Sequence, residues 1–222
     1  MSTPKQASAL IGVLGKQFSA RAMIDVGSPE DTLIMTMLSA RARDEQVLVV
    51  YGPLRKRFPT LQALAKADIR ALERALDTMG LFRAKARLLK ALARALLERH
   101  GGQVPRTMEE LVELPGVGRK TASCVLWYAF GIPAIAVDTH VFRIAKRLGW
   151  AKGRTPEVVE QELRAFLPRD AWGEVNRVFV PFGRAICKSG VPRCEQCPAA
   201  AICPSARLAK RGTLASRSIF RK

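Results

Sequence analysis

Apolar residues recur at every third or fourth position along most of the chain, which is the spacing that places them on one face of an α-helix. The alternation of apolar and polar residues that is typical of half-buried strands is almost absent. The sequence therefore predicts an all-α protein. The expected helices cover residues 5–18, 28–40, 68–79, 82–100, 107–114, 118–130, 139–148, 155–167 and 170–187.

Several of these helices carry capping signals at their ends. Ser28, Asp68 and Thr107 stand directly before a helical pattern, and each can accept a hydrogen bond from a first-turn N–H group. Gly80 and Gly101 follow helical patterns, and glycine commonly ends a helix. The segment TLIMTMLSA after Ser28 is almost wholly apolar, so we expect that helix to be buried.

The chain is strongly basic, with 37 Lys and Arg against 19 Asp and Glu, a formal net charge of +18 and a pI near 10.6. This balance predicts a polyanionic partner, with nucleic acid as the first candidate and an anionic membrane surface as the second. No apolar run reaches the roughly 18 residues that a membrane span needs, and the N-terminus lacks the layout of a signal peptide. We therefore expect a soluble, cytoplasmic protein.

Residues 114–122, LPGVGRKTA, combine a helix end, a tight glycine turn and the start of a second helix. Such a turn points backbone N–H groups outward, Gly116 and Gly118 leave room beside them, and the second helix adds its positive N-terminal dipole. Together with Val117 and Arg119, these features predict a site that binds DNA phosphates and does not recognise particular bases. The alternative is an ordinary connection between two helices.

Lys120 falls in the first turn of the helix that follows this hairpin. The helix dipole and the neighbouring Arg119 both disfavour its charged form, and a neutral amine is a nucleophile. Asp138, in the stretch VDTHVF, is a good N-cap that can still present its carboxylate to a cleft. The alternatives are a solvated surface lysine and a carboxylate that only caps a helix.

Four of the five cysteines lie in one short segment, spaced as Cys187-x6-Cys194-x2-Cys197-x5-Cys203. A disulfide framework would spread them further along the chain, so their crowding favours a metal centre. Four thiolates in one loop suit either an iron–sulfur cluster or a zinc site, and the general rules of spacing do not choose between them. The fifth, Cys124, lies in an apolar helix and is expected in the core.

The hairpin, the lysine, the stretch AVDTHVFRIAKRLG and the cysteine spacing together resemble the helix–hairpin–helix DNA glycosylases, and most closely the endonuclease III family. The resemblance covers roughly residues 25–205. It implies a two-lobed fold, in which residues 22–132 form a six-helix domain with the hairpin. The second lobe would join an N-terminal helix, 1–21, to the C-terminal helices and cluster loop, 133–205. The basic tail, 206–222, is expected to be a flexible arm that adds nonspecific affinity for phosphate.

The resemblance also implies a reaction. Lys120 would attack C1′ of a damaged nucleotide, the base would leave, and β-elimination from the resulting Schiff base would nick the strand. Asp138 would stabilise positive charge on the sugar and assist proton transfers. The implied protein is a monomeric bifunctional DNA glycosylase and AP lyase that acts on oxidised pyrimidines in duplex DNA of the nucleoid. Because the base must first leave the stack, damaged pairs are favoured.

The family pattern further implies a 4Fe–4S cluster on the four cysteines, with a structural and DNA-facing role. Arg193 in the cluster loop, and His140 and Arg143 after Asp138, become expected DNA contacts. Leu81 would wedge into the duplex beside the flipped nucleotide, and the alternative is a hydrophobic contact at a helix end. Four basic residues on the next helix are candidates for phosphate contacts or for a solvated face: Arg83, Lys85, Arg87 and Lys90.

Three departures from the family pattern bear on substrate range. Arg41 stands where the family usually has a glutamine that helps to fill the space left by the base, so opposite-base preference is open. Phe82-Arg83 replaces Tyr-Asn after the wedge leucine, and Phe182 replaces the histidine of a His-Gly-Arg stretch. Two other functions stay open, namely a monofunctional adenine or mismatch glycosylase, against which Lys120 argues, and a DNA-binding paralogue that turns over poorly. A zinc-bound regulator is a third.

Overall fold

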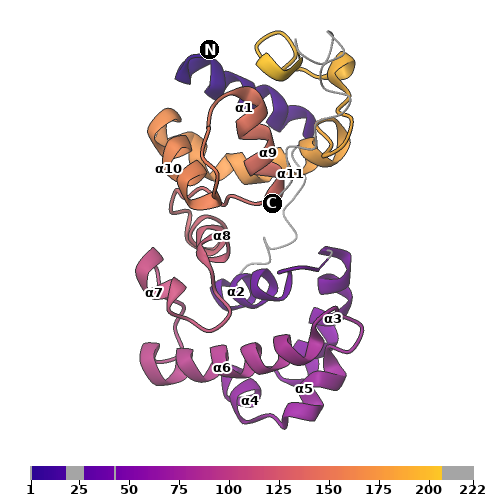
Figure 1. Ribbon diagram of the computed structural model, residues 1–222. Helices are drawn as coiled ribbons and strands as arrows, with labels where there is room; N and C mark the ends of the chain where they lie inside the picture. The colour runs from indigo at the N-terminus through magenta and orange to yellow at the C-terminus, as the bar shows by residue number, and fades with distance from the viewer. Residues whose placement is uncertain (1, 19–27, 43, 207–222) are drawn as a thin grey trace. The chain divides into compact units, whose positions relative to one another are not determined.

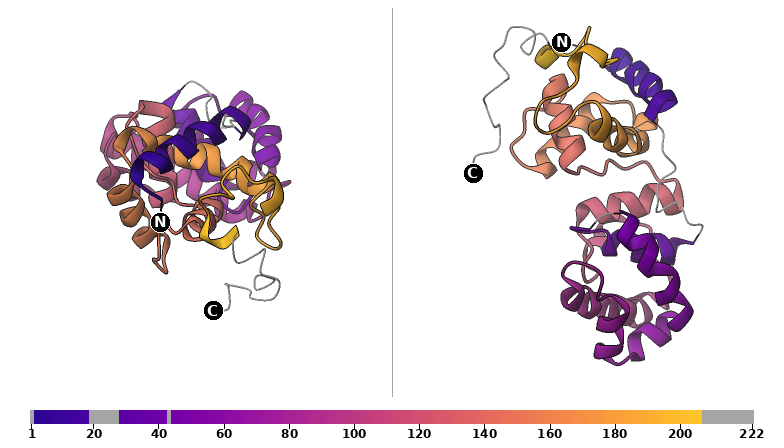
Figure 2. Two further views of the ribbon diagram at one scale, coloured as in Figure 1. Left: turned by 90° about the horizontal axis from the view of Figure 1, so that it is seen from above. Right: turned by 90° about the vertical axis from the view of Figure 1, so that its right-hand side faces the viewer.

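The computed structural model describes residues 2–18, 28–42 and 44–206, and every regular element in these ranges is a helix. The expected all-α class is therefore confirmed. The chain divides into two compact units, which are described separately below. The hairpin unit comprises Ala22–Ile132, and the cysteine unit combines Met1–Arg21 with Pro133–Lys222 (Figure 1, Figure 2).

The described residues of the hairpin unit form seven helices. They are α2 (Pro29–Leu38), α3 (Asp44–Arg57), α4 (Leu61–Lys66), α5 (Ile69–Ala75), α6 (Phe82–His100), α7 (Met108–Val112) and α8 (Arg119–Phe130). Helices α4 and α5 pack against the long α6, while α2 and α7 pack against α8 (Figure 1). Two helices thus organise this unit, and α8 is the one that starts at the hairpin.

Helix α2 is buried, as its apolar sequence predicts. Every residue from Thr32 to Leu38 is buried. The two threonines in this stretch need internal partners, and the Thr36 hydroxyl donates to the Thr32 carbonyl at 2.7 Å. A helix without a solvent face has to be covered on all sides, and α8 supplies one of its covers.

The three predicted N-caps are confirmed. Each side chain accepts a hydrogen bond from the backbone N–H three residues later: Ser28 from Asp31, Asp68 from Ala71, and Thr107 from Glu110. These bonds satisfy donors that have no intrahelical acceptor, and they fix where α2, α5 and α7 begin.

The helix after Asp68 ends earlier than its pattern predicts. Helix α5 stops at Ala75, and the chain then turns through Gly80. Met79 lies in this turn, where its N–H donates to the Leu76 carbonyl at 2.9 Å and its side chain is buried. The turn keeps apolar residues at a spacing of three, so sequence periodicity alone extends the helix too far.

The cysteine unit contains four α-helices and two short 3-10 turns among its described residues. They are α1 (Pro4–Phe18), α9 (Thr139–Leu148), α10 (Pro156–Phe166), η1 (Arg169–Ala171), α11 (Trp172–Ala185) and η2 (Cys194–Gln196). Helices α1 and α9 both pack against α11. Segments from the two ends of the chain therefore share one apolar core.

Aromatic rings fill the centre of this core. The Trp150 ring lies 5.7 Å from the Phe179 ring, and the Phe18 ring meets the Phe182 ring edge-on at 5.4 Å. Phe182, which departs from the family's histidine, is only 1% exposed. This substitution therefore changes the packing of the core and places no new group on the surface.

The basic tail predicted to be flexible lies outside the described residues, because the description ends at Ala206. Among the described residues, none of the helices combines the length and the apolar character that a bilayer crossing demands.

Candidate active site and cysteine cluster

The glycine hairpin lies between α7 and α8 in the hairpin unit. The Val117 N–H donates to the Leu114 carbonyl at 3.1 Å, and the Val117 side chain is buried, so an apolar contact holds the turn from inside. Gly118 is the N-cap of α8 and has no side chain to cap it. The helix therefore begins without a side-chain cap, and an uncapped helix start of this kind is suited to bind a phosphate.

The two hairpin glycines have different reasons to be glycine. Gly116 has a φ of +79°, and a Cβ there would lie 3.2 Å from the Met37 Cγ atom and 3.4 Å from Leu88. Gly118 has an ordinary φ of −93°, and a Cβ there would meet nothing within 4 Å. Both glycines are exposed, but the lack of a side chain clears space only at Gly118, because a side chain at Gly116 would point toward Met37 and Leu88. The fold requires glycine at position 116, and its phosphate contact stays a prediction.

Lys120 stands in the first turn of α8, next to the exposed Arg119, and is half-buried. The helix is anchored behind it, because every residue from Thr121 to Leu126 is buried. Cys124 lies in this stretch at 1% exposure, which confirms the predicted core position. Lys120 thus lies beside the glycine turn on a rigid element, and its nucleophilic role stays a prediction.

Asp138 is the N-cap of α9 in the cysteine unit, as predicted. Its Oδ1 atom accepts hydrogen bonds from the N–H groups of His140 at 2.9 Å and Val141 at 2.8 Å. Both bonds fall on the same oxygen, so the cap does not require Oδ2. The side chain is half-buried and held rigidly, which suits a carboxylate that has to meet a substrate in one orientation.

Two exposed turns of the hairpin unit carry Arg41 and Leu81. Both residues have left-handed backbone conformations, with φ of 54° at Arg41 and 60° at Leu81. Leu81 is 58% exposed, so a hydrophobic contact at the helix end does not account for its side chain. This exposure favours the wedge over its alternative. Phe82 and Arg83, which follow Leu81 and depart from the family pattern, contact each other. The Arg83 guanidinium lies 5.2 Å from the centre of the Phe82 ring.

The basic residues on α6 divide into two groups. Arg83 and Arg87 are exposed and stay candidates for phosphate contacts. The Lys85 and Lys90 ammonium groups point inward instead, with Lys85 donating to the Leu38 carbonyl at 2.7 Å and Lys90 to the Ala67 carbonyl at 2.6 Å. These two are therefore neither phosphate contacts nor part of a solvated face.

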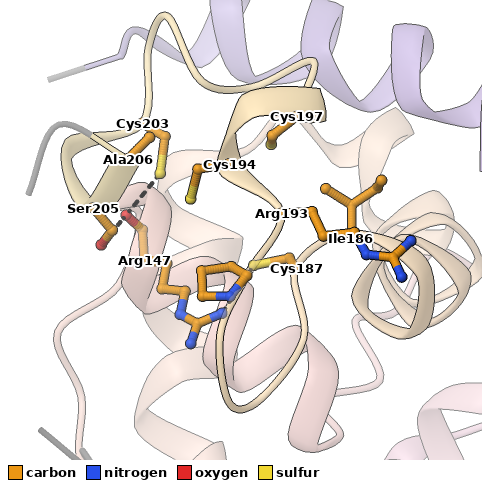
Figure 3. A pocket seen from close by; sticks show the side chains of 10 residues that line it. Arg147, Ile186, Cys187, Arg193, Cys194, Cys197, Cys203, Ser205 and Ala206 are labelled. Carbon is orange, nitrogen blue, oxygen red and sulfur yellow. Dashed lines mark hydrogen bonds between the residues drawn. The ribbon is translucent and has the colours of Figure 1, made fainter. Parts of the chain in front are cut away.

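The four clustered cysteines line one pocket of the cysteine unit (Figure 3). Three apolar residues, Ile186, Pro192 and Ala206, line it with them, together with Arg147, Arg193 and Ser205. All five cysteines are free thiols. The pocket therefore brings together the donor set that the spacing predicted, and Arg193, predicted to bind DNA, is exposed at its edge.

Burial opposes the ionisation of three of these thiols. Burial raises the pKa of Cys197 to about 11 and also raises the pKa of Cys194 and of Cys203. The negative charge that Cys187 would carry adds to each shift. A bound metal centre reverses this effect, because it supplies the positive charge that stabilises thiolates.

Arg143 of α9 holds the segment before the cysteine loop. Its guanidinium donates to the Cys187 carbonyl from Nε at 3.0 Å and from Nη2 at 2.8 Å, and to the Gly183 carbonyl at 3.3 Å. The residue is only 8% exposed. The predicted DNA contact of Arg143 is therefore corrected, because its buried guanidinium is held by these three hydrogen bonds and by a fourth, from Nη1 to the Thr139 carbonyl at 3.3 Å, and so cannot reach a phosphate.

His140 packs against the same group. Its Nδ1 atom lies 3.1 Å from Arg143 Nη2, and a Cβ on Gly183 would come within 2.5 Å of it. Burial lowers the pKa of His140, the Asp138 charge opposes this shift, and Arg143 and Arg184 add to it. His140 is half-buried, and its predicted DNA contact stays a prediction.

Arg147 contacts both ends of the cysteine loop, a role absent from the sequence-based predictions. Its Nη1 atom donates to Cys187 Sγ at 3.3 Å and to the Lys188 carbonyl at 2.6 Å. Its own carbonyl accepts from Cys203 Sγ at 3.4 Å and from the Ser205 hydroxyl at 3.0 Å (Figure 3). The one available signal was that Arg143 and Arg147 share a helix face at a spacing of four.

Comparison with known proteins places the chain in a family. Residues 34–169 match the family described as HhH-GPD superfamily base excision DNA repair protein. Endonuclease III of Thermotoga maritima is 49% identical over 169 residues, which cover 76% of this chain and 79% of that protein. Endonuclease III of a Synechocystis species is 39% identical over 93% of this chain and 96% of its own length.

A solved structure extends the match to the fold. The trapped endonuclease III–DNA covalent intermediate in its estranged-adenine complex superposes with a TM-score of 0.87 at 36% identity, covering 95% of this chain and 100% of that chain. This likeness includes the hairpin unit and the cysteine unit. The chain therefore belongs to the HhH-GPD superfamily of base excision DNA repair proteins and, within it, to the endonuclease III family.

Proposed function

We propose that this chain is a bifunctional DNA glycosylase and AP lyase that removes oxidised pyrimidines from duplex DNA. The observation that carries the proposal is the position of Lys120, a primary amine in the first turn of α8 next to an open, glycine-capped helix end. The chain is also similar over 95% of its length to an endonuclease III that was trapped covalently on DNA. A lysine nucleophile beside a phosphate-binding turn is suited to attack a sugar of the DNA backbone.

The reaction begins with the Lys120 amine. Its neutral Nζ attacks C1′ of the extruded nucleotide, the bond from C1′ to the base breaks, and the base leaves with its bonding electrons and takes up a proton. The bond between C1′ and the ring oxygen O4′ then breaks, O4′ takes up the proton that Nζ gives up, and an iminium forms between Nζ and C1′. Removal of a proton from C2′ then expels the 3′ phosphate, and water releases the lysine.

Asp138 serves this sequence with a carboxylate whose orientation is fixed by the α9 cap. A negative charge near the sugar stabilises the positive charge that develops as the base leaves. The same group is suited to shuttle the protons that the lysine and C2′ give up. Asp138 and Lys120 are the two residues to which we assign the chemistry.

We assign the backbone grip to the hairpin. The N–H groups at the start of α8 bind a phosphate, with Gly118 open to it and Arg119 exposed beside it. Leu81 enters the duplex and Arg41 meets the base that has lost its partner. The net charge of +18 supplies the nonspecific part of the affinity. The protein would act as a monomer on DNA in the cytoplasm or nucleoid.

The four cysteines fit a 4Fe–4S cluster. They line one pocket together with apolar residues. Their spacing, Cys187-x6-Cys194-x2-Cys197-x5-Cys203, resembles that of the 4Fe–4S loop of the endonuclease III family, and this resemblance favours the cluster over zinc. Cys187, Cys194, Cys197 and Cys203 would hold the cluster, which supplies a covalent crosslink for the loop and takes no part in the steps above.

Strand cleavage on two labelled duplexes tests the proposal. One duplex carries thymine glycol and the other an undamaged thymine at the same position. A bifunctional enzyme nicks the thymine glycol strand without added alkali, whereas a monofunctional glycosylase leaves an abasic site that breaks only after alkali treatment. A DNA-binding paralogue retards both duplexes in a gel and cleaves neither.

A further inference from the structure

Lys85 joins two turns of the hairpin unit that lie far apart in sequence. Its main-chain N–H donates to the Leu81 carbonyl at 3.0 Å. Its side-chain Nζ donates to the Leu38 carbonyl at 2.7 Å. Leu38 is the last residue of α2 and Leu81 is the N-cap of α6. A single residue therefore spans from the start of one helix to the end of another.

Each of the two joined ends leads directly into a strained turn. Arg41 lies three residues after Leu38, and Leu81 is itself the other turn residue. Among the described non-glycine residues, Arg41 and Leu81 are the two with positive φ. A non-glycine residue in this region is strained, and such strain concentrates where a side chain must be aimed at a ligand. Both side chains are exposed.

The Lys85 ammonium is an unusual group to bury. The residue is 4% exposed, and in the described part of the chain no carboxylate lies within ion-pair distance of it. Its one compensation is the negative C-terminal end of α2, where the Leu38 carbonyl would otherwise lack an intrahelical donor. Burial accordingly lowers its pKa. Stability alone would favour an apolar side chain here, since a buried unpaired ammonium is costly.

We propose that Lys85 is a positioning residue that fixes the spacing between the Arg41 turn and the Leu81 turn, so that both side chains enter the duplex in register when a base is extruded. The inference rests on the proposed function, because it assigns roles to Arg41 and Leu81 in that reaction. The Lys85 side chain is buried, so in this proposal it acts through the two turns and contacts no reacting atom. Its effect is to hold a wedge and a space-filling group at one distance from each other.

Helix α6 provides a matched control. Lys90 lies on the same helix, is half-buried, and donates from Nζ to the Ala67 carbonyl at 2.6 Å. Ala67 is the C-cap of α4, which carries neither of the two turns. Lys85→Met and Lys90→Met therefore remove the same kind of bond from the same helix, and only the first loosens the two turns.

The test compares two single-turnover rates for each variant. The first is excision from a thymine glycol duplex, which requires extrusion of an intact base. The second is β-elimination on a duplex with a preformed abasic site, where there is no base to extrude. For Lys85→Met we expect the excision rate to fall about tenfold or more, because a small displacement of a positioning group has an effect of this size or larger. The abasic-site rate should fall much less.

The outcomes separate the two proposals. Lys90→Met should keep the wild-type ratio of the two rates, whatever either substitution does to the melting temperature. An unchanged ratio in Lys85→Met, in a wild-type background that excises thymine glycol, would overturn the positioning role alone. A wild type that excises nothing would overturn the proposed function, and the role of Lys85 with it.

A second variant guards against a folding defect. If circular dichroism shows that Lys85→Met does not fold, Lys85→Gln takes its place, since glutamine keeps a polar donor but its side chain is too short to span the same distance. The same ratio is then measured. A second readout is the fluorescence of 2-aminopurine placed opposite the lesion, which should lose its wild-type increase in the Lys85 variant and keep it in Lys90→Met.

Discussion

Arg147 donates a hydrogen bond from Nη1 to the Sγ atom of Cys187 at 3.3 Å, and its main-chain carbonyl accepts one from the Sγ atom of Cys203. The first and last cysteines of the loop are thus tied to one residue of α9. Because α9 begins at Asp138, one helix links the assigned catalytic carboxylate to the cysteine pocket.

Replacement of Arg147 should loosen this loop. Arg147→Met removes donors from Cys187 Sγ and from the loop carbonyls, and we expect the free energy of unfolding to fall by about 1–2 kcal/mol. Loss of iron to a chelator should become faster, and the decay of the visible absorbance measures its rate. Arg154→Met, at an exposed position, is the control. Equal rates of iron loss in the two variants would show that Arg147 does not secure the loop.

Gly183 should tolerate no side chain. A Cβ there would lie 2.5 Å from His140 Nδ1 and 2.9 Å from Arg143 Nη2, both of which are held by further contacts. We expect Gly183→Ala to destabilise the protein by about 1–3 kcal/mol, as overpacking typically does. Gly12→Ala in α1 meets nothing within 4 Å and should be neutral or stabilising. Urea denaturation of both variants checks this, and equal midpoints would refute it.

The two hairpin glycines should separate stability from DNA binding. Gly116→Ala places a side chain at a φ of +79° and against Met37, so we expect a loss of stability of about 1–2 kcal/mol. Gly118→Ala meets no protein atom and should melt like the wild type. Its methyl group would instead crowd a bound phosphate and weaken DNA binding. Melting curves and fluorescence anisotropy distinguish the two, and a Gly118→Ala protein with unchanged affinity would contradict the predicted grip.

The sequence predicted the helical class and many helix boundaries because these depend on neighbours. Ser28, Asp68 and Thr107 cap their own helices three residues away, and the apolar run after Ser28 is buried as expected. Helices α3 and α4 lie outside the predicted ranges. Gly52 and Pro53 inside α3 are typical of a turn, and α4 spans only Leu61–Lys66. Sequence signals were sufficient to predict a helix end where the residues that form it are close together in the sequence.

The errors concern residues whose partners are distant in sequence. Arg143 was expected on DNA because it is basic and follows Asp138, yet its side chain donates to the Gly183 and Cys187 carbonyls, 40 and 44 residues further along the chain. Lys85 bonds to a carbonyl 47 positions away. Gly116 faces Met37 of another helix. Charge and residue type do not reveal whether a donor is turned toward solvent or toward a carbonyl in the core.

Two substitutions of Asp138 should separate its role as the N-cap of α9 from its proposed role in catalysis. Asn accepts the same backbone hydrogen bonds, so Asp138→Asn should keep the stability of α9 within about 0.5 kcal/mol, whereas Asp138→Ala should lose about 1 kcal/mol. Both should lower base excision by about 100-fold or more, because neither retains the charge or the proton acceptor. An Asp138→Asn variant with near wild-type excision would mean that the carboxylate serves only as a cap.

The most direct test of the central claim is borohydride trapping of the protein on a thymine glycol duplex, with wild type and Lys120→Ala side by side. Lys188→Ala, at an exposed lysine in the cysteine loop, is the control. We predict a reduced covalent adduct with wild type and with the control, a digest that places it on Lys120, and no adduct with Lys120→Ala. An adduct of undiminished yield in Lys120→Ala would contradict the assignment of the nucleophile. The lack of any adduct in wild type that still excises the base would contradict the bifunctional mechanism.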